Sequence, residues 1–516
     1  MRAKKNKVGR RLSVHVGLVL MLGACGGGVG LQATTETSGV SAMAPGSIDP
    51  TVTARTCTQA TAWSGEQSRS QSIVARVHAS RTAGVAPMAL LVDATATSAA
   101  SSSVDVYREV SYTFDFCDER GERWNLTGLP KNTQTGGPLA AHVYDLPGVY
   151  TIHMRATDAS GGHSVATVTV VVHNPDIVYE GRRTVCVSPT ANYAGCPSGA
   201  LTQTGLPSSY SGKRVLLRRG ESFGQINIRH GERNVIVGAF GSGNKPRVAS
   251  VRIGSGRPDT ASFAEDVTVM DLNIADGIVQ DNSAARLLLY RNDLADAGNN
   301  NRIWIGAALD YWASSDPYRT ISPGQFYNPR EIFIVENRIQ GGSLSNDSPI
   351  LGTGSRIALL GNDMGYANQH TVRIGRLHKG VMAHNAMRGR SSDGIRHALK
   401  LHSGGLGSYT DSYNGSTWAT RQVVIANNLF GDAQDNNQWT VAVSPQNGVS
   451  AEGLEDVIVE NNRFVRGLRT ASDLVITGRR MTYRGNVRVD GGALGVSLNG
   501  HGEALPTDWR GPYYSQ

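Results

Sequence analysis

Seven segments in the second half of the chain share one pattern of apolar and polar positions. In each segment, two apolar residues at alternating positions precede an asparagine, and another apolar residue usually follows two positions later. The shared asparagines are Asn292, Asn337, Asn362, Asn385, Asn428, Asn462 and Asn486, which lie 45, 25, 23, 43, 34 and 24 residues apart. A base period of 23–25 residues, lengthened by insertions, is typical of a solenoid.

The repeat has strand periodicity and no helical period, which argues against helical and leucine-rich repeats. We therefore predict that residues 176–505 form a right-handed parallel β-helix, with residues 506–516 as a tail. Each repeat would be one coil, with apolar residues inside and an asparagine ladder at one bend. Asparagine suits such a bend because it tolerates left-handed backbone conformations and its side chain can hydrogen-bond its neighbour.

Residues 71–173 read as short strands separated by turn signals, which predicts an antiparallel β-sandwich. Phe114-Asp115-Phe116-Cys117-Asp118 resembles the W-D-F-G-D core of PKD (polycystic-kidney-disease-type) domains. The motifs around His142-Val143-Tyr144, Gly148-Val149-Tyr150-Thr151 and Ala156-Thr157-Asp158 are similar to that family's later motifs, in the same order. Cys117 replaces the usual glycine, and residues 123–137 look like an inserted loop. The resemblance implies a spacer or sugar-contacting module without chemistry of its own, in a chain that is all-β.

The N-terminal residues 1–24 contain six basic residues and no acidic one, and the apolar run 14–22 is too short to span a bilayer. This is typical of a signal peptide. Leu22-Gly23-Ala24-Cys25 resembles the lipobox of bacterial lipoproteins, which implies that Cys25 carries lipid and anchors the chain to a membrane. Gly26 in place of aspartate favours the outer membrane or cell surface; the alternative is ordinary cleavage beside an incidental cysteine. The Ser-, Thr-, Ala- and Gly-rich residues 25–70 are predicted to be a flexible tether.

The net charge and the cysteine content limit which binding partners and metal sites we expect. Without residues 1–24, the chain has 44 basic and 42 acidic residues, so its net charge gives no argument for nucleic-acid binding. Four cysteines remain, and an even number in an exported chain predicts two disulfides. Cys186 and Cys196 close a short loop, which leaves Cys57 with Cys117. No spacing typical of a Cys/His metal site is present, so we predict none, and we expect a monomer.

A second set of strands precedes the asparagine segments, with apolar first and third positions that should face inward. Because side chains alternate along a strand, the second positions should form an outward column, with coils about 4.8 Å apart. That column would contain Trp304, a residue near Leu351, Arg373, Lys400, Ala442 and Val475. His402 and His397 belong to the Lys400 strand. Stacked cations favour binding of an anion, although a solvated, charged outer face is the alternative.

The surrounding composition supports a local basic patch. Residues 370–402 contain seven lysines and arginines, one acidic residue and five of the 13 histidines. Two insertions, 307–329 and 404–421, hold eight of the 33 aromatic residues within 41 positions. Exposed aromatic rings stack on sugars, and long loops in a compact solenoid are usually functional; the alternative is that the rings only pack the loops. The candidate sugar-binding residues are Trp304, Tyr311, Trp312, Tyr409, Tyr413 and Trp418.

The opening coils, including Arg214–Gly220 and Gly241–Pro246, resemble those of β-helix polysaccharide lyases. The stretch Ala398–Ser403 is similar to the lysine strand of the alginate lyase and chondroitinase B type. The resemblance implies β-elimination on a uronate-containing polysaccharide, with Lys400 as base and Arg373 or Arg396 neutralising the carboxylate. Two departures matter: Ala442 stands where those lyases usually carry the arginine, and their asparagine after the lysine strand is missing.

Two other functions remain open. A glycoside hydrolase needs paired carboxylates, and Asp393, Asp411, Asp432 and Asp435 lie outside the predicted column. A lipid-anchored protein that binds glycan, or is purely structural, would fit the tether and the sandwich equally well. The stretch Asp432–Asn437 is a candidate calcium site, with a solvated turn as the alternative; no other cofactor is expected.

Overall fold

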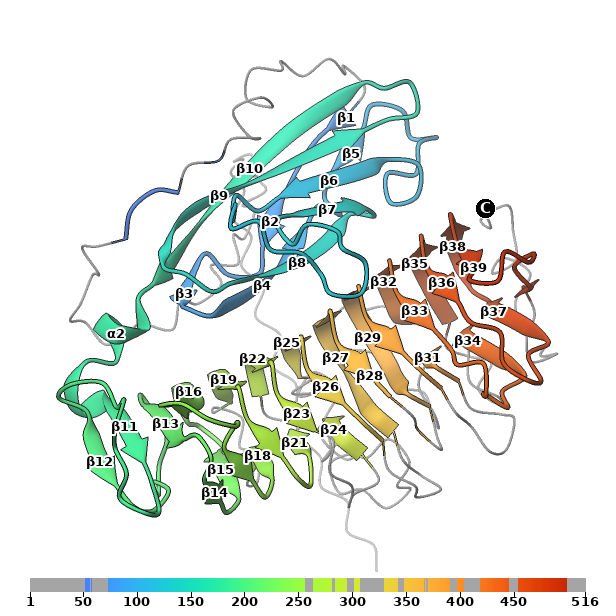
Figure 1. Ribbon diagram of the computed structural model, residues 1–516. Coiled ribbons are helices and arrows are strands. Elements are labelled where there is room, and N and C mark those ends of the chain that lie inside the picture. The colour runs from blue at the N-terminus through green and yellow to red at the C-terminus, as the bar shows by residue number, and fades with distance from the viewer. Residues whose placement is uncertain are drawn as a thin grey trace, which may run out of the picture. The chain divides into compact units, whose positions relative to one another are not determined.

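Short parallel strands wind into successive coils in the computed structural model (Figure 1). The strands stack in three rows, here called faces A, B and C; faces A and B belong to a 20-stranded sheet and face C is a 10-stranded sheet. The structure describes residues 52–55, 57, 73–255, 263–280, 284–294, 301–306, 329–341, 348–365, 367, 370–389, 397–402, 418–444 and 453–498.

Face A carries the strands that precede the asparagine segments. Its strands are β15 (Ile226–Arg229), β18 (Val251–Ser255), β21 (Ile278–Gln280), β24 (Asn301–Ile305), the first parts of β27 (Ser348–Leu360) and β29 (Val372–Ala383), β31 (Leu399–His402), β34 (Trp439–Val443), β37 (Ser472–Ile476) and β40 (Val496–Ser497). Face B comprises β16 (Arg233–Phe240), β19 (Ala264–Met270), β22 (Ala284–Tyr290), β25 (Arg330–Val335), the second parts of β27 and β29, β32 (Trp418–Ala426), β35 (Gly453–Glu460) and β38 (Arg479–Arg484).

Face C follows the asparagines and consists of two-residue strands. They are β14 (Ser222–Phe223), β17 (Arg247–Val248), β20 (Asn273–Ile274), β23 (Asp293–Leu294), β26 (Arg338–Ile339), β28 (Asp363–Met364), β30 (Ala386–Met387), β33 (Leu429–Phe430), β36 (Arg463–Phe464) and β39 (Val487–Arg488). The solenoid opens with α2 (Pro175–Val178), the short 3₁₀ helix η1 (Gly181–Arg183), β11 (Thr184–Val187), β12 (Leu201–Gln203) and β13 (Arg214–Arg218). Inward-facing aliphatic residues of successive coils form one continuous buried core, which confirms the predicted parallel β-helix.

The predicted asparagine ladder is present at the bend between faces B and C. From Asn292 to Asn486, each side-chain amide donates to the Oδ1 atom of the next asparagine at 2.9–3.1 Å. The prediction that asparagine itself takes the left-handed conformation is wrong. The residue just before each ladder asparagine has positive φ, for example Glu336 at 53° and His384 at 61°. The ladder asparagine is therefore selected for its buried hydrogen bonds, since the preceding residue makes the turn.

Residues 73–173 form a sandwich of antiparallel strands, apart from the parallel β3–β10 pair. One sheet has the order β3-β10-β9-β6-β7 and the other the order β2-β4-β8, with β1 and β5 paired separately. The strands are β1 (Ile73–Val74), β2 (His78–Ala79), β3 (Ala83–Val85), β4 (Met88–Asp93), β5 (Ser98–Ala99), β6 (Ser111–Asp115), β7 (Thr133–Gly136), β8 (Leu139–Tyr144), β9 (Gly148–Thr157) and β10 (His163–His173). The stretch predicted to be an inserted loop contains β7, which pairs with β6.

Contacts inside the sandwich explain its motifs. His142 stacks on Phe116, with ring centroids 4.5 Å apart, and its Nε2 atom lies 3.0 Å from Asp118 Oδ2. The Tyr144 hydroxyl donates to the Phe116 carbonyl oxygen at 2.9 Å. Burial alone would raise the pKa of Asp118, but hydrogen bonds and charge from His142 and Arg120 lower it to about 2. The aromatic and acidic motif residues thus hold the two sheets together.

The outward residues of face B are apolar over six consecutive coils. Parallel register aligns Leu288, Phe333, Ala358, Val381, Val424 and Ile458. They share one buried cluster with Ala89, Leu91, Leu139, Ala141 and Val143 from strands β4 and β8 of the sandwich. Apolar residues pointing out of a solenoid are otherwise a liability, so this contact accounts for their presence.

Polar contacts surround that cluster. Lys379 forms an ion pair with Asp93, Lys131 with Glu336, and Arg81 with Asp266. The main-chain N–H of Gly137 donates to Glu460 Oε1 at 3.0 Å. A Cβ atom at position 137 would lie 2.7 Å from the Val424 side chain, so only glycine permits this approach.

Both predicted disulfides are present: Cys57 is bonded to Cys117, and Cys186 to Cys196. Among the residues that the structure describes, no helix is long and apolar enough to cross a membrane.

His384 lies in the contact between the β-helix and the sandwich. Because it is buried there, we predict that the free energy of unfolding depends on pH. Its ring stacks on Trp124 at 5.0 Å, and burial lowers its pKa to about 3. Burial, with help from nearby cations, also lowers the pKa of His378 to about 4. Protonation therefore favours the unfolded state below pH 6.5, and stability should fall as the pH drops from 6.5 to 5, by up to about 1.4 kcal/mol per unit for each histidine.

The measurement is urea unfolding at pH 6.5, 6.0, 5.5 and 5.0, above the range in which most carboxyl groups titrate. His384→Asn, which suits the left-handed backbone at this position, should flatten the dependence. The exposed His78 provides the matched control, and His78→Asn should leave the slope unchanged. Equal slopes for wild type and His384→Asn would contradict the assignment.

Candidate functional site

The outward column of face A has the predicted register. Trp304 pairs with Leu351, Leu351 with Arg373, Arg373 with Lys400, Lys400 with Ala442, and Ala442 with Val475. The intervening residues Ile303, Ile374, Leu401 and Val443 point into the buried core. Strand alternation therefore presents Arg373 and Lys400 on the same surface of two adjacent coils.

Arg373, Lys400 and His402 form the centre of the candidate site, here called the basic cluster. Arg373 Nε donates to His402 Nε2 at 3.3 Å, which makes His402 a neutral imidazole with its proton on Nδ1. Register places Gly375 beside His402, so no side chain at 375 competes with the arginine for this position.

Thr420, which the sequence did not single out, supports the His402 end of the cluster. Its hydroxyl donates to the His402 carbonyl oxygen at 2.8 Å and accepts from the Leu377 N–H at 3.3 Å. The threonine is fully buried at the start of face B, in the same coil as His402 and one coil after Leu377. No sequence signal marked it, because its role depends on how the two strands meet.

The basic cluster is not a solvated surface. Lys400 is 6% exposed and His402 1% exposed, while Arg373 is half-buried. Lys400 and His402 are therefore not open to solvent, as the alternative of a solvated outer face would require. Partly covered cations hold an anion more strongly than solvated ones, because water screens them less. This burial disfavours the alternative of scattered, solubilising charges.

His397, another candidate catalytic residue, lies in a ladder of stacked rings at the start of the strands. Its ring is 5.0 Å from that of His370 and 5.8 Å from that of Trp439. The His397 N–H donates to His370 Nδ1 at 3.0 Å, and His397 Nδ1 donates to the Trp439 carbonyl oxygen at 2.8 Å. His397 and His370 are almost fully buried. These contacts suit a role in positioning the Lys400 strand.

The rest of the predicted basic patch is divided among different surfaces. Lys379 pairs with Asp93 of the sandwich, and His384 packs on Trp124 there. Arg388 pairs with Asp363 on face C. The basic residues that are close together in the sequence thus lie in three separate environments, because a coil turns through three faces within about 25 residues.

Several candidates lie outside the described residues: Arg396, Tyr311, Trp312, Tyr409 and Tyr413. Trp418 begins β32, but its side chain is also outside them, and Trp304 is half-buried on face A. Of the carboxylates weighed for hydrolysis, Asp393 and Asp411 are not described.

In the stretch Asp432–Asn437, which was a candidate calcium site, carboxylate oxygens accept hydrogen bonds from groups of the same turn. Asp432 Oδ1 accepts from the Gln434 N–H at 2.7 Å, and Asp435 Oδ2 accepts from Asn437 Nδ2 at 2.8 Å. Among the described residues, one group has metal-ligand geometry, and it consists of Cys57, Cys117 and His153. Its two sulfurs are joined in the disulfide, so the group is not a metal centre in this state.

A family model matches the sandwich. Residues 77–172 match the family model of the PKD domain, within the predicted 71–173. No curated protein matches this chain. One solved structure, of carbohydrate-binding modules of the β-sandwich superfamily with promiscuous specificity, is 21% identical, with a TM-score of 0.16. That match covers 20% of this chain and spans 36% of the other. The chain is thus all-β, with a PKD domain at 77–172 followed by a parallel β-helix.

Proposed function

We propose that the β-helix binds an acidic, uronate-containing polysaccharide at the basic cluster and cleaves it by β-elimination. The observation that carries the proposal is the register of Arg373 beside Lys400, with Arg373 hydrogen-bonded to a neutral His402. Three nitrogen side chains meet on one partly covered surface. Such a surface suits a carboxylate-bearing ligand more than a neutral sugar chain.

Each residue has a role in the proposed reaction. Arg373 neutralises the uronate carboxylate and so makes the C5–H more acidic, as preorganised charge does for a developing anion. Lys400 acts as a neutral amine and removes the C5 proton; the neighbouring guanidinium favours that neutral form. The electron pair forms the C4–C5 double bond as the C4–O bond breaks, and the leaving oxygen takes a proton from water. His402 holds Arg373 in place, with Arg396 as the alternative neutralising residue.

We also propose where the protein is located in the cell. Lipid on Cys25 would anchor the chain to a bacterial membrane, with the outer membrane or cell surface favoured. Of the tether predicted at 25–70, residues 52–55 and Cys57 are fastened to the sandwich, so we propose that the part before residue 52 lets the chain reach polysaccharide as a monomer.

The test is absorbance at 235 nm with residues 26–516 and a panel of uronate polysaccharides, with and without calcium. Elimination creates a conjugated double bond that absorbs at this wavelength, so absorbance should rise on at least one substrate. New reducing ends without absorbance would overturn elimination in favour of hydrolysis. Retention on an immobilised polysaccharide, without cleavage of any member of the panel, would favour the non-catalytic binder.

Trp304 gives a prediction about binding. It lies three coils from Lys400 in the same column and is half-buried. A ring there can stack on a sugar bound along face A. Trp304→Ala should raise KM for polymer about 10-fold, equivalent to about 1.4 kcal/mol, and change kcat little. Val279→Ala, one coil earlier, is the matched control and should have a much smaller effect. An unchanged KM for Trp304→Ala would remove the tryptophan from the site.

A further inference from the structure

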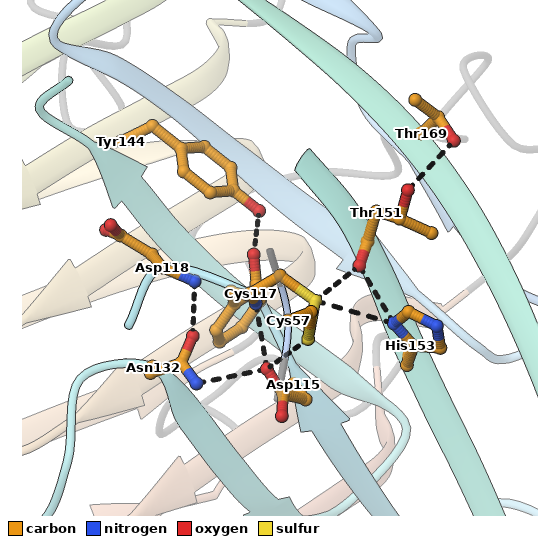
Figure 2. The surroundings of a disulfide bond; sticks show 10 residues. Cys57, Asp115, Cys117, Asp118, Asn132, Tyr144, Thr151, His153 and Thr169 are labelled. Atoms are coloured by element: carbon orange, nitrogen blue, oxygen red, sulfur yellow. Dashed lines mark hydrogen bonds between the residues drawn. A yellow bond between two sulfur atoms is a disulfide. The ribbon is translucent and has the colours of Figure 1, made fainter. Parts of the chain in front are cut away.

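The segment before the sandwich is fastened to it at several points. Ala54 forms a parallel bridge with Val149 of β9, where the Arg55 N–H donates to the Val149 carbonyl oxygen at 2.9 Å. Arg55 Nη2 donates to the Pro147 carbonyl oxygen at 2.6 Å. Two residues later, Cys57 is bonded to Cys117, which follows β6 (Figure 2). The disulfide therefore closes a clasp, which here means residues 52–55 and Cys57 held on the sandwich.

Cys117 occupies an unusual position for a residue with a side chain. Its φ is 55°, in the left-handed region, where the PKD motif usually carries glycine. A side chain in that region destabilises the backbone by roughly 1–2 kcal/mol. The bond to Cys57 supplies a physical reason for cysteine here, because closing a loop of 60 residues restricts the unfolded chain.

The two sulfurs have opposite surroundings. Cys57 is partly exposed, and its Sγ atom lies 3.8 Å from Asp115 Oδ1. Cys117 is 1% exposed, and its Sγ atom lies 3.5 Å from His153 Nδ1 (Figure 2). His153 Nδ1 also donates to the Thr151 carbonyl oxygen at 2.9 Å, which fixes the proton on this nitrogen. The Cys117 sulfur thus lies beside the His153 N–H and, at 2.8 Å, the Thr151 carbonyl oxygen, whereas the Cys57 sulfur lies beside a carboxyl group.

We propose that the Cys57–Cys117 disulfide is a thiol-exchange site, which external dithiols open by attack on Cys57. Exposure admits the attacking thiolate to Cys57 Sγ, and the leaving electron pair goes to Cys117 Sγ. The leaving sulfur of Cys117 can take a proton from His153, and the resulting thiol has the Thr151 carbonyl oxygen as its acceptor, whereas Cys57 Sγ faces the Asp115 carboxyl group, which carries no proton when ionised. A more stable leaving thiolate makes exchange faster.

The step balances as follows. The first thiolate of the dithiol forms a mixed disulfide with Cys57 as the protein S–S bond breaks. Cys117 Sγ takes a proton through His153, whose other nitrogen takes one from water, and the new thiol can donate to the Thr151 carbonyl oxygen 2.8 Å away. The second thiol of the reagent then displaces Cys57, so the reagent is oxidised to a disulfide and both cysteines are reduced. Opening removes the covalent closure of the clasp and leaves residues 52–55 held by hydrogen bonds alone.

The experiment treats the folded chain with dithiothreitol, stops aliquots by alkylation and follows each cysteine by peptide mass spectrometry. The Cys186–Cys196 disulfide is an internal control, since no imidazole contact is found at its sulfurs within the described residues. We expect Cys57–Cys117 to open at least 10-fold faster, with the trapped mixed disulfide on Cys57. His153→Phe keeps a ring but removes the N–H, and should slow that opening about 10-fold without changing the control.

Three results would overturn the proposal: equal opening rates for the two disulfides, a mixed disulfide on Cys117, or an unchanged rate in His153→Phe. The control disulfide lies in the β-helix and reports the activity of the reagent; a misfolded sandwich would expose the Cys57–Cys117 bond and speed its opening, so misfolding cannot be mistaken for a slower exchange.

Discussion

Lys400→Met is expected to lower kcat for polysaccharide cleavage by about 10²–10⁴-fold, the range found for removal of a positioned base. Methionine fills nearly the same space as lysine, and a side chain that is only 6% exposed needs that packing. Loss of the amine should therefore remove proton abstraction while leaving the fold and much of the substrate binding intact. The measurement is the initial rate of absorbance increase at 235 nm, with KM determined separately.

A matched control separates this effect from a general loss of positive charge. Lys213, in the opening coils, donates to the Ser209 carbonyl oxygen at 2.7 Å and lies outside the column of face A. Lys213→Met should leave kcat and KM unchanged. Arg373→Ala should impair both, because the arginine touches the carboxylate before and during elimination. Full activity in Lys400→Met would exclude this lysine as the base.

The register of the candidate site could be predicted because two periodicities agree in the sequence. The asparagine spacing aligns the coils, and strand alternation then assigns Ile374 inward and Arg373 outward. Neither step needs contacts between distant parts of the chain. The sandwich was predicted from strand and turn signals and from its family motifs. These motif residues contact one another: the Tyr144 hydroxyl donates to the Phe116 carbonyl oxygen, and His142 stacks on Phe116 and lies against Asp118.

Exposure could not be predicted in this way, because it depends on what covers each face. Lys379 and Arg373 are six residues apart and both basic, yet Lys379 pairs with Asp93, 286 positions earlier. The apolar outward positions of face B likewise have their partners in β4 and β8. The residue pattern within one coil does not show which side chains of another domain will contact that coil. The basic patch expected from composition therefore included residues, such as Lys379, that contact the sandwich and do not belong to the site on face A.

The asparagine ladder gives the largest expected effect on stability. Asn428 Oδ1 accepts from both the main-chain N–H and the Nδ2 of Asn385, at 3.0 and 2.9 Å. Its own Nδ2 donates to the Met382 carbonyl oxygen at 2.8 Å and to Asn462 Oδ1 at 3.0 Å. Asn428→Ala leaves several of these groups without partners inside a site that is 1% exposed. Each unpaired buried group destabilises by about 1–3 kcal/mol, so a loss of about 4 kcal/mol or more is expected.

Urea unfolding followed by far-ultraviolet circular dichroism measures this loss, and Asn486→Ala is its matched control. Asn486 ends the ladder and is partly exposed, although its Oδ1 also accepts from both donors of Asn462. Water can replace those bonds there, so its loss should be about 1–2 kcal/mol. The difference between the two variants measures what burial and the bond to a following asparagine add, because both delete the same amide. Equal losses would contradict this prediction, because they would mean that neither burial nor the bond to a following asparagine adds to the stability that the ladder supplies.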